Sequence, residues 1–178
     1  MLSFLLLSTL INNSFADDYH SPYHHEKELH HDEYDNQNAW MINPKVVICE
    51  NMTDFTVSQV KYSISALKKS SMTKSVERRS SCDYSHEFGI IKIVDAKHVP
   101  SSLWGKTKYI YRDGYSNSGK EIIILKSAVV QLDRNVTDIT LLIHELGHAY
   151  GLEHYDGEPD IMNTNHDFWP SYSYKYDY

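Results

Sequence analysis

Three histidines near the C-terminal end of the chain have the types and the spacing that metal chemistry requires. His144 and His148 are four residues apart, so on a helix they project from one face and can bind the same metal ion. Gly151 permits a sharp turn after that helix, and the turn can bring His154 back as a third ligand. Neutral imidazoles bind zinc at about 2.0 to 2.1 Å, so one Zn²⁺ is the expected ion.

Glu145 directly follows the first of these histidines and would lie beside the metal without binding it. Three protein ligands leave a fourth position open to water, which is typical of catalytic rather than structural zinc sites. Zinc lowers the pKa of a bound water to about 7, and Glu145 would remove its proton as a general base. The residues therefore indicate hydrolysis at a carbonyl carbon.

The run from His144 to His154 resembles the motif of the metzincin metallopeptidases, His-Glu-x-x-His-x-x-Gly-x-x-His, at all five fixed positions. In that family a methionine in a tight turn follows the motif, and Met162 in residues 159–163 (PDIMN) is similar to it. Among metzincins the chain most resembles the matrixin-like secreted group. The likeness covers residues 144–163 at the level of motif and the remainder only in the order of elements.

The resemblance implies an α/β (α+β) fold: a twisted mixed sheet with two long helices, of which the active-site helix is followed by the methionine turn. It also implies a secreted zinc-dependent endopeptidase that acts on a protein or peptide substrate, with Glu145 as the catalytic base. In metzincins an edge strand above the active-site helix pairs with extended substrate. By order along the chain this edge should lie near Lys106 to Tyr111, with Glu121 to Leu125 as the alternative.

Two positions depart from the family. Some members carry a zinc-binding tyrosine two residues after the methionine, where this chain has Thr164. Neither cysteine matches the inhibitory cysteine motif of matrixin propeptides. An alternative function is a catalytically inactive, zinc-containing binding module on the same scaffold, and a third is a metal-scavenging protein. Glu145 favours the enzyme, because a binding site needs no base at that position.

Two helices are expected. Thr56 and Gln59 form a capping-box pattern that predicts a helix over residues 57–70. The second, metal-binding helix is expected to begin after Asn135 as its N-cap, with Asp138 in its first turn. Gly151 is expected to end it in the left-handed conformation. Its apolar stripe consists of Val136, Ile139, Leu142, Ile143, Leu146 and Ala149.

Apolar runs between and before these helices predict strands at residues 45–49, 88–94, 107–112 and 121–132. Residues 113–119 (DGYSNSG) form a loop in this interpretation, and residues 72–86 fit no element. The order of strands and helices suits an α/β sandwich with a mixed sheet.

The N-terminal part of the chain predicts export. Leu2 to Ile11 is an apolar run of signal-peptide length, and Ser14-Phe15-Ala16 fits a cleavage site near Ala16. The alternative is an N-terminal core strand. The expected organisation is a signal peptide (1–16), a His-rich acidic flexible arm (17–39) and a catalytic domain (40–178).

The arm carries most of the charge. Seven acids and one base give it −6 of the formal net charge of −7, so the domain itself is nearly neutral. Its five histidines could bind additional metal, or the arm could be a solvated tail or a short inhibitory propeptide. Oxygen ligands between Asp113 and Glu121 could hold calcium, although a plain hairpin loop fits as well.

Composition limits the remaining possibilities. A chain of 178 residues suits one domain, which we expect to be monomeric. No long basic stretch indicates nucleic-acid binding, and no later apolar run is long enough to span a membrane. An exported chain with two cysteines, Cys49 and Cys82, is expected to join them in a disulfide, with buried free thiols as the alternative.

Overall fold

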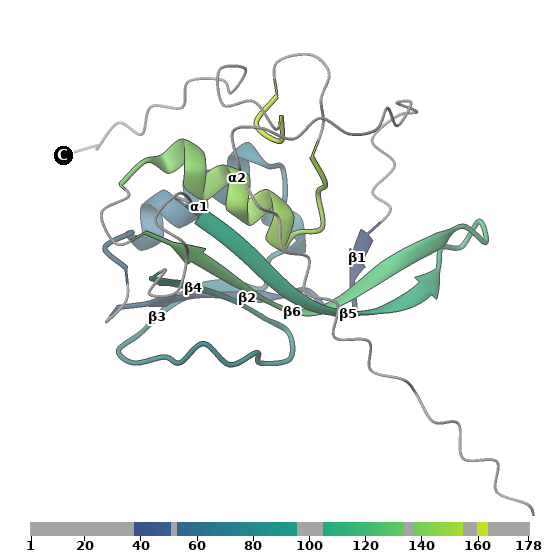
Figure 1. Ribbon diagram of the computed structural model, residues 1–178, viewed down its shortest axis with the longest axis horizontal. Helices are drawn as coiled ribbons and strands as arrows, with labels where there is room; N and C mark the ends of the chain where they lie inside the picture. The colour runs from purple at the N-terminus through teal and green to yellow at the C-terminus, as the bar shows by residue number, and fades with distance from the viewer. Residues whose placement is uncertain (1–37, 51–52, 96–104, 134–136, 155–159, 164–178) are drawn as a thin grey trace, which may run out of the picture.

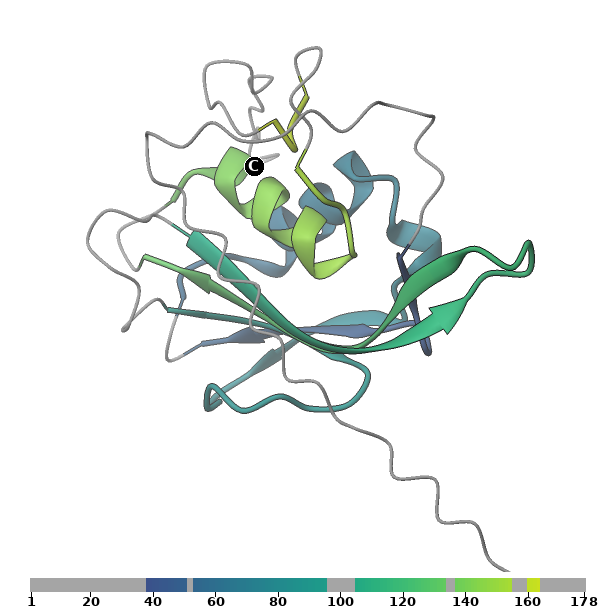
Figure 2. The ribbon, with the colours of Figure 1, turned by 45° about the vertical axis from the view of Figure 1, so that its right-hand side comes forward.

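The computed structural model describes residues 38–50, 53–95, 105–133, 137–154 and 160–163. In this part of the chain one six-stranded sheet carries two α-helices on one of its faces (Figures 1 and 2). The prediction of an α/β fold with two helices is therefore confirmed. The predicted signal peptide, and all of the His-rich arm before Asn38, lie outside the described residues.

The sheet is mixed, as expected, but mostly parallel. Its strand order is β1-β6-β4-β2-β3, with β5 on the free side of β6. Every pairing is parallel except that of β5 with β6. The strands are β1 (Asn38–Trp40), β2 (Lys45–Cys49), β3 (Ser75–Arg79), β4 (Ile90–Asp95), β5 (Gly105–Tyr115) and β6 (Glu121–Leu132).

β5 is an edge strand within the described part of the chain. It pairs with β6 along its whole length, from Gly105 to Tyr115. β6 is paired on both sides, because β1 and β4 occupy the side that β5 leaves free. The expected edge near Lys106 to Tyr111 is confirmed. The alternative at Glu121 to Leu125 is wrong, because that segment lies inside the sheet.

The two helices are shorter than expected. α1 (Val57–Ala66) has the predicted capping box: Gln59 N donates to Thr56 Oγ1, and the Gln59 side chain accepts from Thr56 N. It ends before residue 70 because the chain turns at Lys68, which has a φ of 55°. α2 (Ile139–Ala149) begins later than expected.

The predicted N-cap of α2 was wrong. Asp138 is the N-cap, and its carboxylate accepts from Thr140 N at 2.8 Å. Both Asn135 and Asp138 are good cap residues, and the sequence pattern does not separate them. Asn135 and Val136 lie outside the described residues.

The main core lies between the sheet and the helices. Alternate residues of β4 show the division: Ile91 and Ile93 belong to the helix-side core, while Val94 packs on the opposite face. Strands that are buried on both faces read as continuous apolar runs, which is typical of parallel sheets. The helix-side core fixes α2, because Leu142, Leu146 and Ala149 are all buried in it.

The segment between β3 and β4 covers the other face of the sheet. The predicted disulfide joins Cys49 at the end of β2 to Cys82 in this segment, with the Cα atoms 5.5 Å apart. Lys92 on β4 is only 1% exposed, and its Nζ contacts Glu87 Oε1 at 2.6 Å and Asp83 Oδ1 at 3.0 Å. The disulfide and this ion pair network together fasten the segment to the sheet.

Two segments differ from expectation. Residues 75–79, which fitted no element, form the polar outer strand β3, parallel to β2. Asp113 to Tyr115 continue β5 instead of starting the loop, so β5 and β6 form a hairpin that extends beyond the helices (Figure 1). Within the described residues, neither helix has the length and apolar character that a membrane span requires.

Candidate metal centre

The end of α2 turns the chain back toward the helix. Gly151 has the predicted left-handed conformation, with a φ of 86°. Its N–H donates to His148 O at 2.8 Å, and Leu152 N donates to Gly147 O at 3.0 Å. These two bonds form a Schellman motif. The reversal allows His154, six residues beyond His148, to return to the face that carries the other histidines.

The three predicted ligands converge. The Nε2 atoms of His144 and His148 are 3.1 Å apart, those of His148 and His154 are 3.1 Å apart, and those of His144 and His154 are 3.3 Å apart. A tetrahedral zinc ion with Zn–N distances of about 2.0 to 2.1 Å requires neighbouring nitrogens about 3.3 Å apart. The triangle of nitrogens therefore fits a single tetrahedral metal ion.

Main-chain carbonyls hold two of the rings. His144 Nδ1 lies 2.7 Å from Ile161 O, and His148 Nδ1 lies 2.9 Å from Leu152 O. A carbonyl only accepts, so each Nδ1 must carry the hydrogen and donate it. In the neutral ring this leaves Nε2 without a hydrogen, which is the form that binds a metal.

The electrostatics of this arrangement favour a cation. The unprotonated Nε2 atoms of His144 and His148 direct lone pairs into one small space, where they repel one another unless a cation lies between them. His144 is 0% and His148 is 6% exposed, so water gives little screening. Three imidazole nitrogens suit zinc, copper, iron or nickel ions.

A tight turn packs beneath the helix. Asn163 N donates to Asp160 O at 3.1 Å, and Met162 N donates to the Asp160 carboxylate at 2.8 Å. The turn places the Ile161 carbonyl against His144, and it buries Met162 against the helix backbone at Gly147. The turn predicted around Met162 is therefore present and in contact with the histidine-bearing helix.

Glu145 is buried beside the triad and faces the edge strand. It is 1% exposed, and its Oε2 accepts from Thr107 Oγ1 at 2.7 Å. Gly105 adjoins the same carboxylate. These two β5 residues belong to no recognisable sequence motif. The one signal in the sequence is that Gly105, Thr107 and Tyr109 are alternate residues of a strand. Alternate residues share a face, and Tyr109 packs on the face of β5 that lies toward α2.

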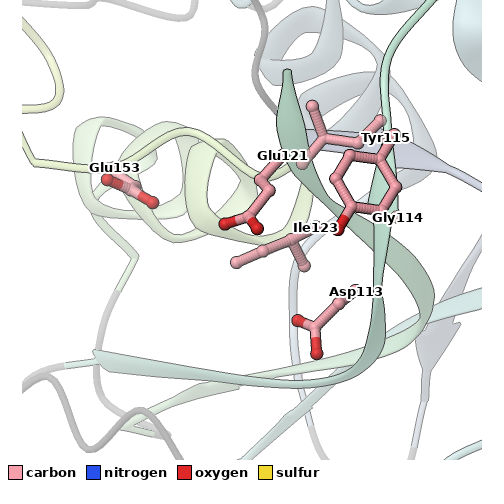
Figure 3. Close-up of a pocket in the computed structure, with 7 residues that line it drawn as sticks. Asp113, Gly114, Tyr115, Glu121, Ile123 and Glu153 are labelled. Atoms are coloured by element: carbon pink, nitrogen blue, oxygen red, sulfur yellow. The ribbon is translucent and has the colours of Figure 1, made fainter. Parts of the chain in front are cut away.

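A pocket of about 580 Å³ lies between the β5–β6 hairpin and the chain that follows α2 (Figure 3). Asp113, Glu121 and Glu153 contribute carboxylates to its lining, and Tyr115 contributes an aromatic ring. Glu153 directly precedes His154 in the chain, so one residue of the pocket lining is next in sequence to a histidine of the triad.

The histidine triad is the single group of this kind in the described part of the chain. Its members are the only set of three or more His, Cys, Asp or Glu found there whose ligand atoms all lie within 4.8 Å of one another. The carboxylates near Asp113 and Glu121 are not gathered in this way, so the calcium alternative gains no support. The histidines of the arm lie outside the described residues.

Comparison of the chain with protein-family models, with curated proteins and with solved structures found no significant match.

Proposed function

We propose that the chain is a secreted zinc-dependent endopeptidase of the metzincin type. The observation that carries the proposal is the convergence of three histidine Nε2 atoms within 3.1 to 3.3 Å of one another, next to the buried carboxylate of Glu145. His144, His148 and His154 would hold the ion. When bound, zinc supplies Lewis acidity, which polarises a carbonyl and lowers the pKa of water to about 7.

In this proposal Glu145 removes a proton from the attacking water and later returns it to the leaving amine. Its place on α2, one residue after His144, would keep the carboxylate beside the histidines that hold the ion. The main-chain acceptors Ile161 O and Leu152 O keep the rings of His144 and His148 in one orientation and tautomer. Loss of a hydrogen-bond acceptor of this kind from a metal-binding histidine commonly lowers metal affinity about 10- to 100-fold.

The edge strand β5 supports a peptide as substrate. It runs alongside α2, and among the described residues it pairs with a strand, β6, on one side only. An extended peptide that added to this edge would gain main-chain hydrogen bonds with little demand on its sequence. The carbonyl to be attacked would then be presented to the side of the sheet that carries α2.

Two further features agree with the proposal. The turn at Asp160–Asn163 with buried Met162 agrees with the metzincin resemblance of the sequence. The Cys49–Cys82 disulfide agrees with export to an oxidising compartment, where such bonds persist. The signal peptide with cleavage near Ala16 remains part of this proposal.

The test compares Glu145→Gln with the wild type in the zinc-loaded protein. A diverse peptide library, read by mass spectrometry, should contain peptides that the wild type cleaves. Glu145→Gln should keep its zinc and its fold but lose about 10²- to 10⁴-fold in kcat. Glu77→Gln is the matched control, because Glu77 lies on β3 at the far edge of the sheet and should leave cleavage unchanged.

Cleavage by Glu145→Gln at the wild-type rate would show that the assigned mechanism is wrong. A wild type that holds zinc but cleaves no peptide between about pH 5 and 9, with or without residues 17–37, would favour the inactive binding module. If the protein becomes active only after residues 17–37 are removed, the arm is an inhibitory segment.

A further inference from the structure

The hydroxyl of Thr107 on β5 contacts Glu145 at two points. Its Oγ1 lies 2.7 Å from Glu145 Oε2 and 2.8 Å from Glu145 O. Both residues are buried, at 5% and 1% exposure. A hydroxyl has one hydrogen, and an ionised carboxylate accepts it more strongly than a neutral carbonyl does. The contact therefore restrains the carboxylate of Glu145 from the side of the edge strand.

Gly105 lies two residues earlier on the same face of β5 and provides the space for the other carboxylate oxygen. A Cβ at this position would lie 2.7 Å from Glu145 Oε1 and 2.9 Å from Glu145 Cγ. The backbone φ of Gly105 is not positive, so an alanine there would meet no conformational strain. A side chain at this position would instead force the Glu145 side chain to shift.

We infer that Thr107 is the positioning residue of Glu145, and that Gly105 keeps open the space in which the carboxylate lies. The inference rests on the proposed function, because the direction of the carboxylate matters only if Glu145 is the base. A base must lie within hydrogen-bond reach of the proton that it removes. Misplacement by about 1 Å can lower a rate about 100-fold.

The chemistry of a hydroxyl suits this position. The hydroxyl of Thr107 donates its one hydrogen to Glu145 Oε2, so the buried carboxylate keeps a hydrogen-bond partner on the side of β5.

Steady-state kinetics of the zinc-loaded full chain test the inference. Thr107→Val keeps the branched shape and removes the hydroxyl, so kcat should fall about 10- to 100-fold while KM and zinc content stay near the wild type. Thr107→Ser keeps the hydroxyl and should restore most of kcat. Gly105→Ala should lower kcat as well, because its methyl group would occupy the space of Glu145 Oε1.

Thr73→Val is the matched control. Thr73 Oγ1 lies 2.5 Å from Tyr150 Oη, away from Glu145. The same chemical change should therefore lower the melting temperature without lowering kcat. A fall in kcat of equal size in Thr73→Val and Thr107→Val would show a general loss of rigidity and would overturn the inference.

A double-mutant cycle gives a readout that needs no activity. Thr107→Val should lower the melting temperature more in the wild type than in Glu145→Ala, because only the wild type leaves a buried carboxylate without the hydroxyl. Equal losses in both backgrounds would overturn the positioning role even if peptides are cleaved. An inactive wild type with a clear coupling would instead retain the Thr107–Glu145 contact and overturn only the catalytic proposal.

Discussion

The side chain of Met162 lies directly against the backbone of Gly147 in the middle of α2. A Cβ at Gly147 would come within 2.3 Å of Met162 Sδ and 3.1 Å of its Cε. The glycine between His144 and His148 therefore leaves the space that the buried Met162 side chain occupies. It allows the turn that carries the Ile161 carbonyl to approach the helix and reach His144.

Gly147→Ala should lower the free energy of unfolding, although alanine has the higher helix propensity. Propensity alone favours alanine by about 1 kcal/mol, but overpacking of a buried contact costs about 1 to 3 kcal/mol. Urea unfolding should show a net loss. In a Met162→Ala background the overlap is gone, and the same substitution should become stabilising. A stabilising Gly147→Ala in the wild type would contradict this packing.

Metal content should follow the triad. The protein without residues 17–37 should bind about one zinc per chain, because the described residues supply one three-histidine site. His148→Ala should lose zinc on dialysis. His86→Ala should keep it, since His86 lies against Ser127 on the face of β6 away from α2. Elemental analysis measures the zinc content of both variants. Full zinc retention by His148→Ala would contradict the assignment of the site.

Substrate pairing along β5 should have a period of two. Alternate residues of a paired strand point their N–H groups toward the partner. N-methylation of successive peptide bonds in a cleaved peptide should therefore lower kcat/KM at every second position, by about 5- to 10-fold for each lost hydrogen bond. The side chains are unchanged in this series, so a loss without alternation would mean that side-chain pockets bind the peptide.

The contact of Lys92 with Glu87 should make the stability of the fold depend on pH in the acidic range. Hydrogen bonding to Lys92, with a smaller contribution from Arg79, holds the pKa of Glu87 below its ordinary value of 4.5. The carboxylate therefore stabilises the fold above about pH 4.5, and this stabilisation is lost as the pH falls through the lowered pKa.

Glu87→Gln should accordingly melt below the wild type near pH 7, and the difference should shrink below pH 4.5. Circular dichroism melts from pH 7 to 3, recorded with a chelator so that metal release does not contribute, measure this difference. Glu77→Gln should change the melting temperature little, because Glu77 forms an exposed 3.8 Å pair with Lys45. If the melting temperatures of the wild type and Glu87→Gln differ by the same amount from pH 7 to 3, the ionisation of Glu87 does not contribute to stability.

The disulfide should account for part of the stability of the sheet. Cys49 and Cys82 are 33 residues apart, and a loop of this size corresponds to about 3 to 4 kcal/mol in the chain-entropy model. The double substitution of both cysteines by alanine should lower the free energy of unfolding by a similar amount. A reducing agent should lower the stability of the wild type to that of the variant and leave the variant unchanged.

The histidine triad and the two helices could be predicted because each has a strong local pattern. Spacing places His144 and His148 on one helix face, and Gly151 has the left-handed conformation that ends α2. The end of α1 could not be predicted, since Lys68 adopts a positive φ that favours glycine or asparagine.

Tertiary contacts determined what the sequence pattern missed. β3 is polar because it is an outer strand, with Glu77 and Arg78 partly in solvent, so it lacks the apolar run of β2. Thr107 and Gly105 have no local motif. Both contact Glu145, which lies 38 residues after Thr107 in the chain.

The position of β6 has a consequence for how the chain acquires its structure. β1, β4 and β5 all pair with β6, yet β6 is the last of the six strands to be synthesised. Among the described residues, β6 is the single strand with which all three pair. Contacts as distant as Asn38 with Ile123 make folding slow, because the loop between them must close first. β1 and β5, which among the described residues pair with β6 alone, can therefore join the sheet only after β6 has been made, whereas β2, β3 and β4 can pair before it.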